Sequence, residues 1–270
     1  MRTLLATVVL GTLIGTSTMQ AADMARPRIA APAEPAFSWT GAYLGGSIGG
    51  RWSDVTWTTT SVQGPTSQVP PDPVTSVTGF DSSTFRGGGY LGYNWLFAPQ
   101  WLIGVEGDLA WGNSGNTRGG IPGTFPSGPP SFANPSAAGI DSSRISEDWD
   151  GSIRGRIGFL IAPTWLAYAT GGAAWQSVEL NATCNGLANN FPASWCGSVN
   201  RSESVSHTAT GFTVGGGVEA NLAGNWLARA EYRYSDYGTL NHTFFAFPDT
   251  FVMSETLKTH TLSFGLAYKW

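Results

Sequence analysis

The stretch APQWLIGVEGDLAW (residues 98–111) is a short turn followed by a strand in which apolar and polar side chains alternate. Related stretches follow as APTWLAYATGGAAW (residues 162–175) and AGNWLARAEYRYS (residues 223–235). The tryptophans that begin the three strands lie 64 and 61 residues apart, at Trp101, Trp165 and Trp226. This internal repeat predicts β-hairpins. Tryptophans at strand starts are typical of a membrane interface, where the indole ring suits both acyl chains and headgroups.

Eight segments alternate in this way, and each has the ~9–11 residues with which a tilted barrel strand crosses a bilayer. They are Trp39–Trp52, Thr84–Phe97, Trp101–Trp111, Asp148–Ile161, Trp165–Ser177, Thr208–Asn221, Trp226–Asp236 and Thr259–Trp270. Three of the links are tight turns, whereas four are long: Ser53–Ser83, Gly112–Glu147, Val178–His207 and Tyr237–Lys258. Short turns on one side and long loops on the other are typical of outer-membrane barrels. We therefore expect an all-β fold, an eight-stranded antiparallel up-and-down transmembrane β-barrel.

The N-terminal region predicts export. Arg2 precedes an apolar stretch from Leu4 to Ile14, which indicates a signal peptide of residues 1–21 with cleavage after Ala21. Residues 22–36 are rich in Ala and Pro and predict a periplasmic linker, so the barrel domain is expected to comprise residues 37–270. No later stretch offers the roughly 18 consecutive apolar residues of a membrane helix, so strands must provide any membrane crossing.

The composition agrees with a membrane barrel. Glycine accounts for 36 of 270 residues, and charged residues are 12% of the chain, about half of the usual ~25%. A soluble domain of this size needs more surface charge to stay dispersed. The net charge of −4 provides no basic surface for nucleic acid.

Alternate positions along each strand form two faces, of which one is apolar and uncharged and the other carries charges. The charged positions are Arg86, Glu106, Asp108, Asp150, Arg154, Arg156, Glu219, Arg229, Glu231, Arg233 and Lys269. A soluble lipocalin-like barrel would also alternate, with its apolar face inward. Aromatic residues at the strand ends, long loops on one side only, and a polar face made of arginines and carboxylates favour the membrane barrel, with the charges inside.

The six inward cations nearly balance the five inward anions. We expect an interior charge network that forms a salt-bridged plug, because an unpaired charge in a confined interior is costly. The alternative is an open pore, which would favour a ring of charges of one sign.

Candidate residues for catalysis are few. The histidines are His207, His242 and His260, and the neighbouring Ser206 and His207 lie on opposite faces of any strand. No nucleophile and base are assembled by the pattern, so we predict no enzymatic activity, no catalytic residue, no cofactor and no metal site. Cys184 and Cys196 are the only cysteines, and the oxidising exported location predicts a disulfide that closes a surface loop.

Several motifs together resemble the RopB-type small outer-membrane proteins of alphaproteobacteria. They are FSWTGAYLGGSIGG, GGGYLGYNWLFAPQWLIGVEGDLAW, GRIGF, YATGGAAW, TGFTVGGGVEANLAGNWLARAEYRYSDYG and THTLSFGLAYKW. The resemblance covers Phe37 to Trp270 apart from the long loops. It implies an eight-stranded, porin-like barrel in the cell outer membrane of a Gram-negative organism. The implied partners are outer-membrane lipid, lipopolysaccharide and, during insertion, the barrel assembly machinery.

The final strand resembles the signal by which such proteins are recognised for assembly, carried by Leu262, Phe264, Leu266, Tyr268 and Trp270. Trp270 stands where phenylalanine is more usual. A periplasmic aromatic girdle is expected from the residues at the short-turn end, Trp39, Trp101, Trp165, Trp226 and Trp270.

The functional expectation is an envelope barrel that maintains structure and surface exposure and conducts little or nothing. One alternative is a narrow diffusion porin. A second is an adhesin or ligand-binding barrel that contacts an extracellular ligand through its long loops.

Overall fold

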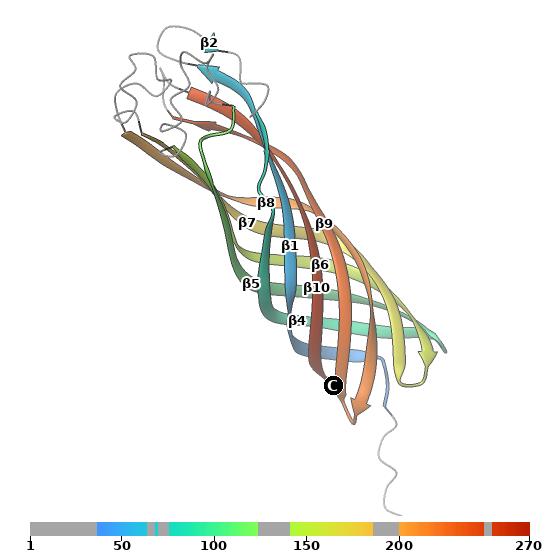
Figure 1. The fold of residues 1–270 in the computed structure, drawn as a ribbon. Helices are drawn as coiled ribbons and strands as arrows, with labels where there is room; N and C mark the ends of the chain where they lie inside the picture. Colours follow the sequence, from blue (N-terminus) through green and yellow to red (C-terminus); the bar gives the residue numbers. More distant parts are fainter. Residues whose placement is uncertain (1–36, 64–67, 70–75, 124–140, 186–199, 246–249) are drawn as a thin grey trace, which may run out of the picture. The chain divides into compact units, whose positions relative to one another are not determined.

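Eight long antiparallel strands pair in chain order and close into a ring in the computed structural model (Figure 1). The structure describes residues 37–63, 68–69, 76–123, 141–185, 200–245 and 250–270. The long strands are β1 (Gly41–Gln63), β4 (Ser82–Ala98), β5 (Trp101–Gly119), β6 (Ser142–Ala162), β7 (Trp165–Asn185), β8 (Asn200–Ala223), β9 (Trp226–Phe244) and β10 (Thr250–Lys269). The ring closes because β10 pairs with β1, from Tyr43 opposite Lys269 to Gln63 opposite Thr250. The predicted eight-stranded barrel is confirmed.

Two short strands, β2 (Gln68–Val69) and β3 (Val77–Gly79), also pair with β1. The predicted signal peptide and linker, residues 1–36, lie outside the described residues. No helix in the described part of the chain is long and apolar enough to cross a membrane.

An apolar band covers the outside of the barrel next to the short turns. On β5 it begins at Trp101 and ends at Trp111, and on β7 it begins at Trp165 and ends at Trp175. Trp101 and Trp111 are 45% and 58% exposed, which places both on the outer surface. Each span from one tryptophan to the next comprises eleven residues, which matches the ~9–11 that cross a bilayer. We call this part of the barrel, between the two tryptophan levels, the membrane-spanning half.

The strands continue far beyond this band toward the long loops. β1 runs eleven residues past Trp52, to Gln63, and β6 begins at Ser142. The prediction that Ser53–Ser83, Gly112–Glu147, Val178–His207 and Tyr237–Lys258 are loops was therefore wrong for the parts of them that form strands. We call these strand continuations the extension. It comprises β1 beyond Trp52, β5 beyond Trp111, β7 beyond Trp175 and the parts of the neighbouring strands that lie beside them.

The inward-facing side chains change character between the two parts. On β1 the inward residues of the membrane-spanning half include Ser47 and Arg51, whereas those of the extension include Val55 and Trp57, and all four are buried. The outward residues change in the opposite sense, from Ile48 at 59% exposure to polar residues such as Asp54. Side-chain alternation thus continues along the strand while the apolar face moves from the outside to the inside.

The ring of strand pairing opens at the boundary with the extension. Pairing of β8 with β9 ends where Phe212 lies opposite Asp236, and pairing of β4 with β5 ends where Gly87 lies opposite Trp111. Strands β5 to β8 remain paired with one another beyond these points, as do β9, β10 and β1. Figure 1 shows the strands diverging toward the end that carries β2.

A hydrophobic core fills the space between these two groups of strands. Trp57, Phe244 and Phe251 come from one group, and Val178 and Leu180 come from the other, and all are buried. The Trp57 ring stacks on Phe244 at 5.7 Å and on Phe251 at 6.0 Å between ring centroids. The extension is therefore packed as two facing sheets rather than as a water-filled tube.

Candidate functional site: the charged interior

Six arginines and six carboxylates fill the interior of the membrane-spanning half and its boundary with the extension. They form one set of ion pairs that we call the charged plug: Arg51, Arg86, Arg154, Arg156, Arg229, Arg233, Glu106, Asp108, Glu147, Asp150, Glu219 and Glu231. Their side chains are at most 6% exposed. Equal numbers of opposite charges allow mutual neutralisation in a setting that water screens poorly.

The part of the plug next to the extension centres on Asp150 of β6. Its carboxylate accepts hydrogen bonds from Arg86 at 2.6 Å and from Arg51 at 2.9 Å. Arg86 also donates to Asp108 at 2.6 Å, and Arg51 also pairs with Glu147 at 3.2 Å. These residues come from β1, β4, β5 and β6, so the ion pairs connect four neighbouring strands.

The part of the plug next to the short turns centres on Glu106 of β5. Arg154 donates to Oε1 of Glu106 and Arg229 donates to Oε2, both at 2.5 Å. Arg154 also donates to Glu231 at 2.7 Å, and Arg156 pairs with Glu219 at 3.1 Å. Because Arg229 and Glu231 lie on β9, these contacts cross the interior from one wall to the other.

Tyrosines fill the space between the arginines. The guanidinium of Arg229 lies 3.5 Å above the centroid of the Tyr90 ring, and that of Arg156 lies 4.0 Å above the Tyr168 ring. Such stacking of a cation on an aromatic ring stabilises a charge that has lost its hydration. Gly45 makes room for Tyr90, since a Cβ atom at Gly45 would lie 2.5 Å from Cζ of that tyrosine. The interior glycines thus leave space for the large side chains of the plug.

The interior at the short-turn end is closed by apolar side chains. Leu102, Leu166 and Leu227 are buried there together with Trp39. Trp39 is only 3% exposed, and its indole N–H donates to the carbonyl oxygen of Pro163 at 3.1 Å. Its expected place in the outward girdle was therefore wrong. Trp39 precedes β1, which begins at Gly41, so strand parity does not determine the direction of its side chain.

The other residues of the expected girdle lie on the outer surface. Trp101, Trp165, Trp226 and Trp270 are between 45% and 64% exposed. Trp226 and Tyr268 meet edge to face at 5.4 Å, as do Tyr268 and Trp270. The proposed assembly residues Leu262, Phe264 and Leu266 also point outward from β10.

One residue of the expected charge network is not among the ion pairs. Lys269 is buried, but its Nζ donates to the carbonyl oxygens of Thr40 at 2.6 Å and Trp270 at 3.1 Å. It is the last residue of β10 and lies beside these two carbonyl acceptors. Lys269 therefore fastens the ends of the barrel strands and does not neutralise a plug carboxylate.

Two residues of the plug were missed by the sequence reasoning. Arg51 shares parity with the inward positions of its strand, and that parity is the signal that could have found it. Glu147 shares parity with the outward Trp149, but the register of β6 shifts between Glu147 and Asp150. This bulge turns Glu147 inward, and a local irregularity of this kind leaves no clear mark in the alternation.

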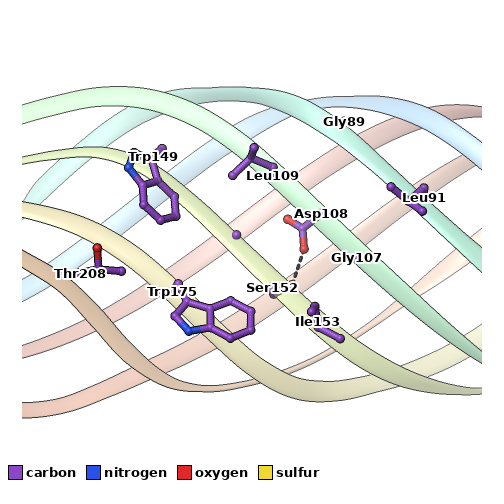
Figure 2. A pocket seen from close by; sticks show the side chains of 11 residues that line it. Gly89, Leu91, Gly107, Asp108, Leu109, Trp149, Ser152, Ile153, Trp175 and Thr208 are labelled. Atoms are coloured by element: carbon purple, nitrogen blue, oxygen red, sulfur yellow. Dashed lines mark hydrogen bonds between the residues drawn. The ribbon is translucent and has the colours of Figure 1, made fainter.

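The outside of the barrel carries an apolar hollow, seen in Figure 2. Leu91, Leu109 and Ile153 line it together with Trp149 and Trp175. Three glycines with no side chain to fill the space also line it, Gly89, Gly107 and Gly151. It faces the region expected to hold acyl chains, near the tryptophan level that borders the extension.

The cysteines and histidines that the sequence singled out lie away from the charged plug or outside the described residues. Cys184 is buried and disulfide-bonded, whereas Cys196 lies outside the described residues. His207 faces the interior of the extension, and Ser206 is exposed on the opposite face of β8. His260 lies on the outside, where its Nδ1 is 2.6 Å from the hydroxyl of Tyr232.

The comparisons with known proteins agree with this architecture. The family model described as "Outer membrane protein beta-barrel domain" matches residues 12–269. The 25 kDa outer-membrane immunogenic protein of Brucella abortus biovar 1 is 28% identical over 91% of this chain and 86% of its own length. The 22 kDa outer membrane protein of Rhizobium leguminosarum bv. viciae is 29% identical over 77% of this chain and 68% of its own length.

Solved structures are more distant. The outer membrane protease OmpT from Escherichia coli aligns with a TM-score of 0.48 and 10% identity, covering 85% of this chain and 97% of that protein. A likeness of this size carries no argument about function.

Proposed function

The chain belongs to the outer-membrane β-barrel family, and we propose that it serves as a closed structural barrel that presents its extension at the cell surface. Its expected place among the small outer-membrane barrels of alphaproteobacteria is confirmed by the Brucella and Rhizobium relatives. It is a protein of the outer membrane.

The observation that carries the proposal is the charged plug. Its arginines reach from one wall to the other, and buried tyrosines occupy the space between them. An eight-stranded barrel is just wide enough for side chains to fill it. Ion flow would require several buried charge pairs to separate together, which is energetically costly. We therefore expect little or no conductance.

Two further features support a role at the cell surface. The extension has a polar outside and a packed apolar core, as expected of a structure that stands in water beyond the membrane. The Brucella relatives are named immunogenic proteins of the outer membrane. For this chain, we propose that the extension and the loops it carries are exposed outside the cell, and that lipid and lipopolysaccharide contact the outer apolar band.

Single-channel recording tests whether the interior is closed. Refolded protein in planar bilayers should give only small or rare conductance steps. The double variant Tyr43→Ala/Tyr168→Ala removes two interior rings and should give larger steps. The matched control Tyr93→Ala/Tyr232→Ala removes two outward rings, which are 51% and 50% exposed, and should behave as the unmodified protein.

Large, long-lived channels in the unmodified protein would contradict the proposal and would favour the narrow diffusion porin. An equal gain of conductance in both double variants would show that the interior tyrosines do not close the barrel. Heat-modifiable migration on gels should be measured for every variant, so that only folded protein is compared.

A further inference from the structure

Three side chains capable of binding a metal meet inside the extension, away from the charged plug. They are His207 of β8, His242 of β9 and Glu255 of β10, and one ligand atom of each lies within 4.8 Å of the others. Nε2 of His207 and Nε2 of His242 each lie 3.5 Å from Oε2 of Glu255. The sequence pattern did not predict this cluster, because His242 and Glu255 lie in a link that was predicted to be a loop.

Five polar atoms of these groups are buried without hydrogen-bond partners among the described residues, although the two histidine side chains are 16% and 11% exposed. Glu255 is 2% exposed, and within the described part of the chain neither of its carboxylate oxygens has a hydrogen-bond partner. The same holds for both ring nitrogens of His207 and for Nε2 of His242. A buried carboxylate left in this condition is costly, and buried charges are normally paired or bound to a metal.

The surroundings of the cluster strengthen this cost. The neighbouring inward residues on the three strands include Ala209 of β8, Phe244 of β9 and Met253 of β10, all buried members of the apolar core. Water is a poor competitor for ligands in such an environment. Burial lowers the pKa of His207 below its ordinary value, opposed by Glu255 and assisted by His242, and the neutral imidazole is the form that binds metals.

The cluster also lies at an opening in the strand pairing. β8 and β9 stop pairing with each other where Phe212 lies opposite Asp236. His207 and His242 lie beyond this point, where β8 pairs only with β7 and β9 only with β10. The backbone N–H of Phe245 donates to Glu203 at 2.6 Å, which links the two strands farther along the extension. The histidine rings lie between these two connections, with their centroids 4.5 Å apart.

We propose that His207, His242 and Glu255 bind one divalent transition-metal ion, with Zn²⁺ as the best chemical match, and that the ion joins β8 to β9. Two imidazoles and one carboxylate are a donor set that Zn²⁺ accepts in tetrahedral sites, with the fourth position left for water. Bonds of ~2.0–2.2 Å in a tetrahedron place neighbouring ligand atoms ~3.4 Å apart. The two nitrogen-to-oxygen distances of 3.5 Å already match this value.

Zinc titration of the full refolded protein in detergent micelles tests the site. Isothermal calorimetry and metal analysis after gel filtration should find one Zn²⁺ bound per chain at pH 7.5. Affinity should fall at least tenfold in each of His207→Ala, His242→Ala and Glu255→Gln, since one of three ligands is lost. Affinity should also fall on acidification to pH 5.5, because protons compete for the imidazoles.

His260→Ala is the matched control, because His260 is the remaining histidine and lies on the outer surface beside Tyr232. It should bind zinc as the unmodified protein does. No stoichiometric binding to the unmodified protein, or an equal loss in His260→Ala, would overturn the proposal. Glu255→Gln keeps the shape of the side chain, so it remains informative if an alanine variant fails to fold.

Limited proteolysis tests whether the ion joins the two strands. Zinc should slow cleavage within the extension severalfold in the unmodified protein and in His260→Ala, but not in His242→Ala. Stoichiometric binding without any protection of the extension would contradict the strand-joining role.

Discussion

The membrane-spanning half and the extension are built on the same strands but distribute polar and apolar side chains in opposite ways between the inside and the outside. In the membrane-spanning half the outside is apolar and the inside holds the charged plug, as Ile48 and Arg51 of β1 illustrate. In the extension the outside is polar and the inside is apolar, as Asp54 and Trp57 of the same strand illustrate. The solvent outside decides the arrangement: lipid requires an apolar outer surface, and water does not.

The difference also shows how each half is held together. Inside a ring of strands surrounded by lipid, burial of apolar surface gives little driving force, so directional ion pairs and hydrogen bonds connect the walls. In the extension, surrounded by water, an aromatic core drives the two sheets together. Substitutions in the two halves should therefore act through different physical causes.

Breaking the charged plug should have the largest effect. Arg154→Ala removes the partner shared by Glu106 and Glu231 and leaves both carboxylates buried with fewer donors. We expect a loss of unfolding free energy at the upper end of ~3–5 kcal/mol, measured by urea titration in lipid vesicles. Lys269→Met is the control: this inward cation donates to two carbonyl oxygens and lies 5.8 Å from the centroid of the Phe37 ring, and its loss should cost about 1–2 kcal/mol. Equal losses would contradict a cooperative plug.

Removing the centre of the aromatic core should damage the extension selectively. Trp57→Ala deletes a fully buried ring that stacks on Phe244 and Phe251, at an expected cost of about 4 kcal/mol. Proteases should then cleave the extension while the membrane-spanning half keeps its heat-modifiable migration. Trp52→Ala, on the outside of the same strand, should leave the extension resistant. Loss of both halves together in Trp57→Ala would show that they fold as one unit.

A charge on the outer surface should distinguish the two halves most directly. Ile157→Arg places a cation on the lipid-facing surface, where a cost of ~2–4 kcal/mol is expected. Ser206→Arg places the same side chain on the exposed outside of the extension and should change stability by less than ~0.5 kcal/mol. Folding yield into vesicles measures the difference. Similar yields would mean that the position of the membrane boundary is wrong.

Much of the membrane-spanning half could be predicted from sequence because one rule applies along each strand. Alternate residues face lipid, so Trp101, Ile103 and Val105 are apolar while Glu106 and Asp108 point inward. The predicted directions of side chains were incomplete or wrong at a few positions. A bulge turns Glu147 inward, and Trp39 precedes the strand and folds into the barrel. Arg51 occupies an ordinary inward position of β1, so the same rule does apply to it.

The extension could not be predicted in the same way. Its strands alternate too, but their apolar residues point inward and are separated by stretches rich in Ser, Thr and Asn, which are typical of loops. Val55, Trp57 and Phe251 become a core only when distant strands face one another across the opened ring. The histidine and glutamate cluster depends on the same arrangement.

By itself, the sequence determined the number of strands, the side of the barrel that meets lipid and the charged character of the interior. These follow from a local cause, since alternation and strand length must satisfy a lipid environment residue by residue. Only the tertiary structure decided which arginine pairs with which carboxylate, how far the strands extend and which side chains meet between β8 and β9. Those outcomes depend on strand register and on contacts between residues far apart in the chain, which no local pattern specifies.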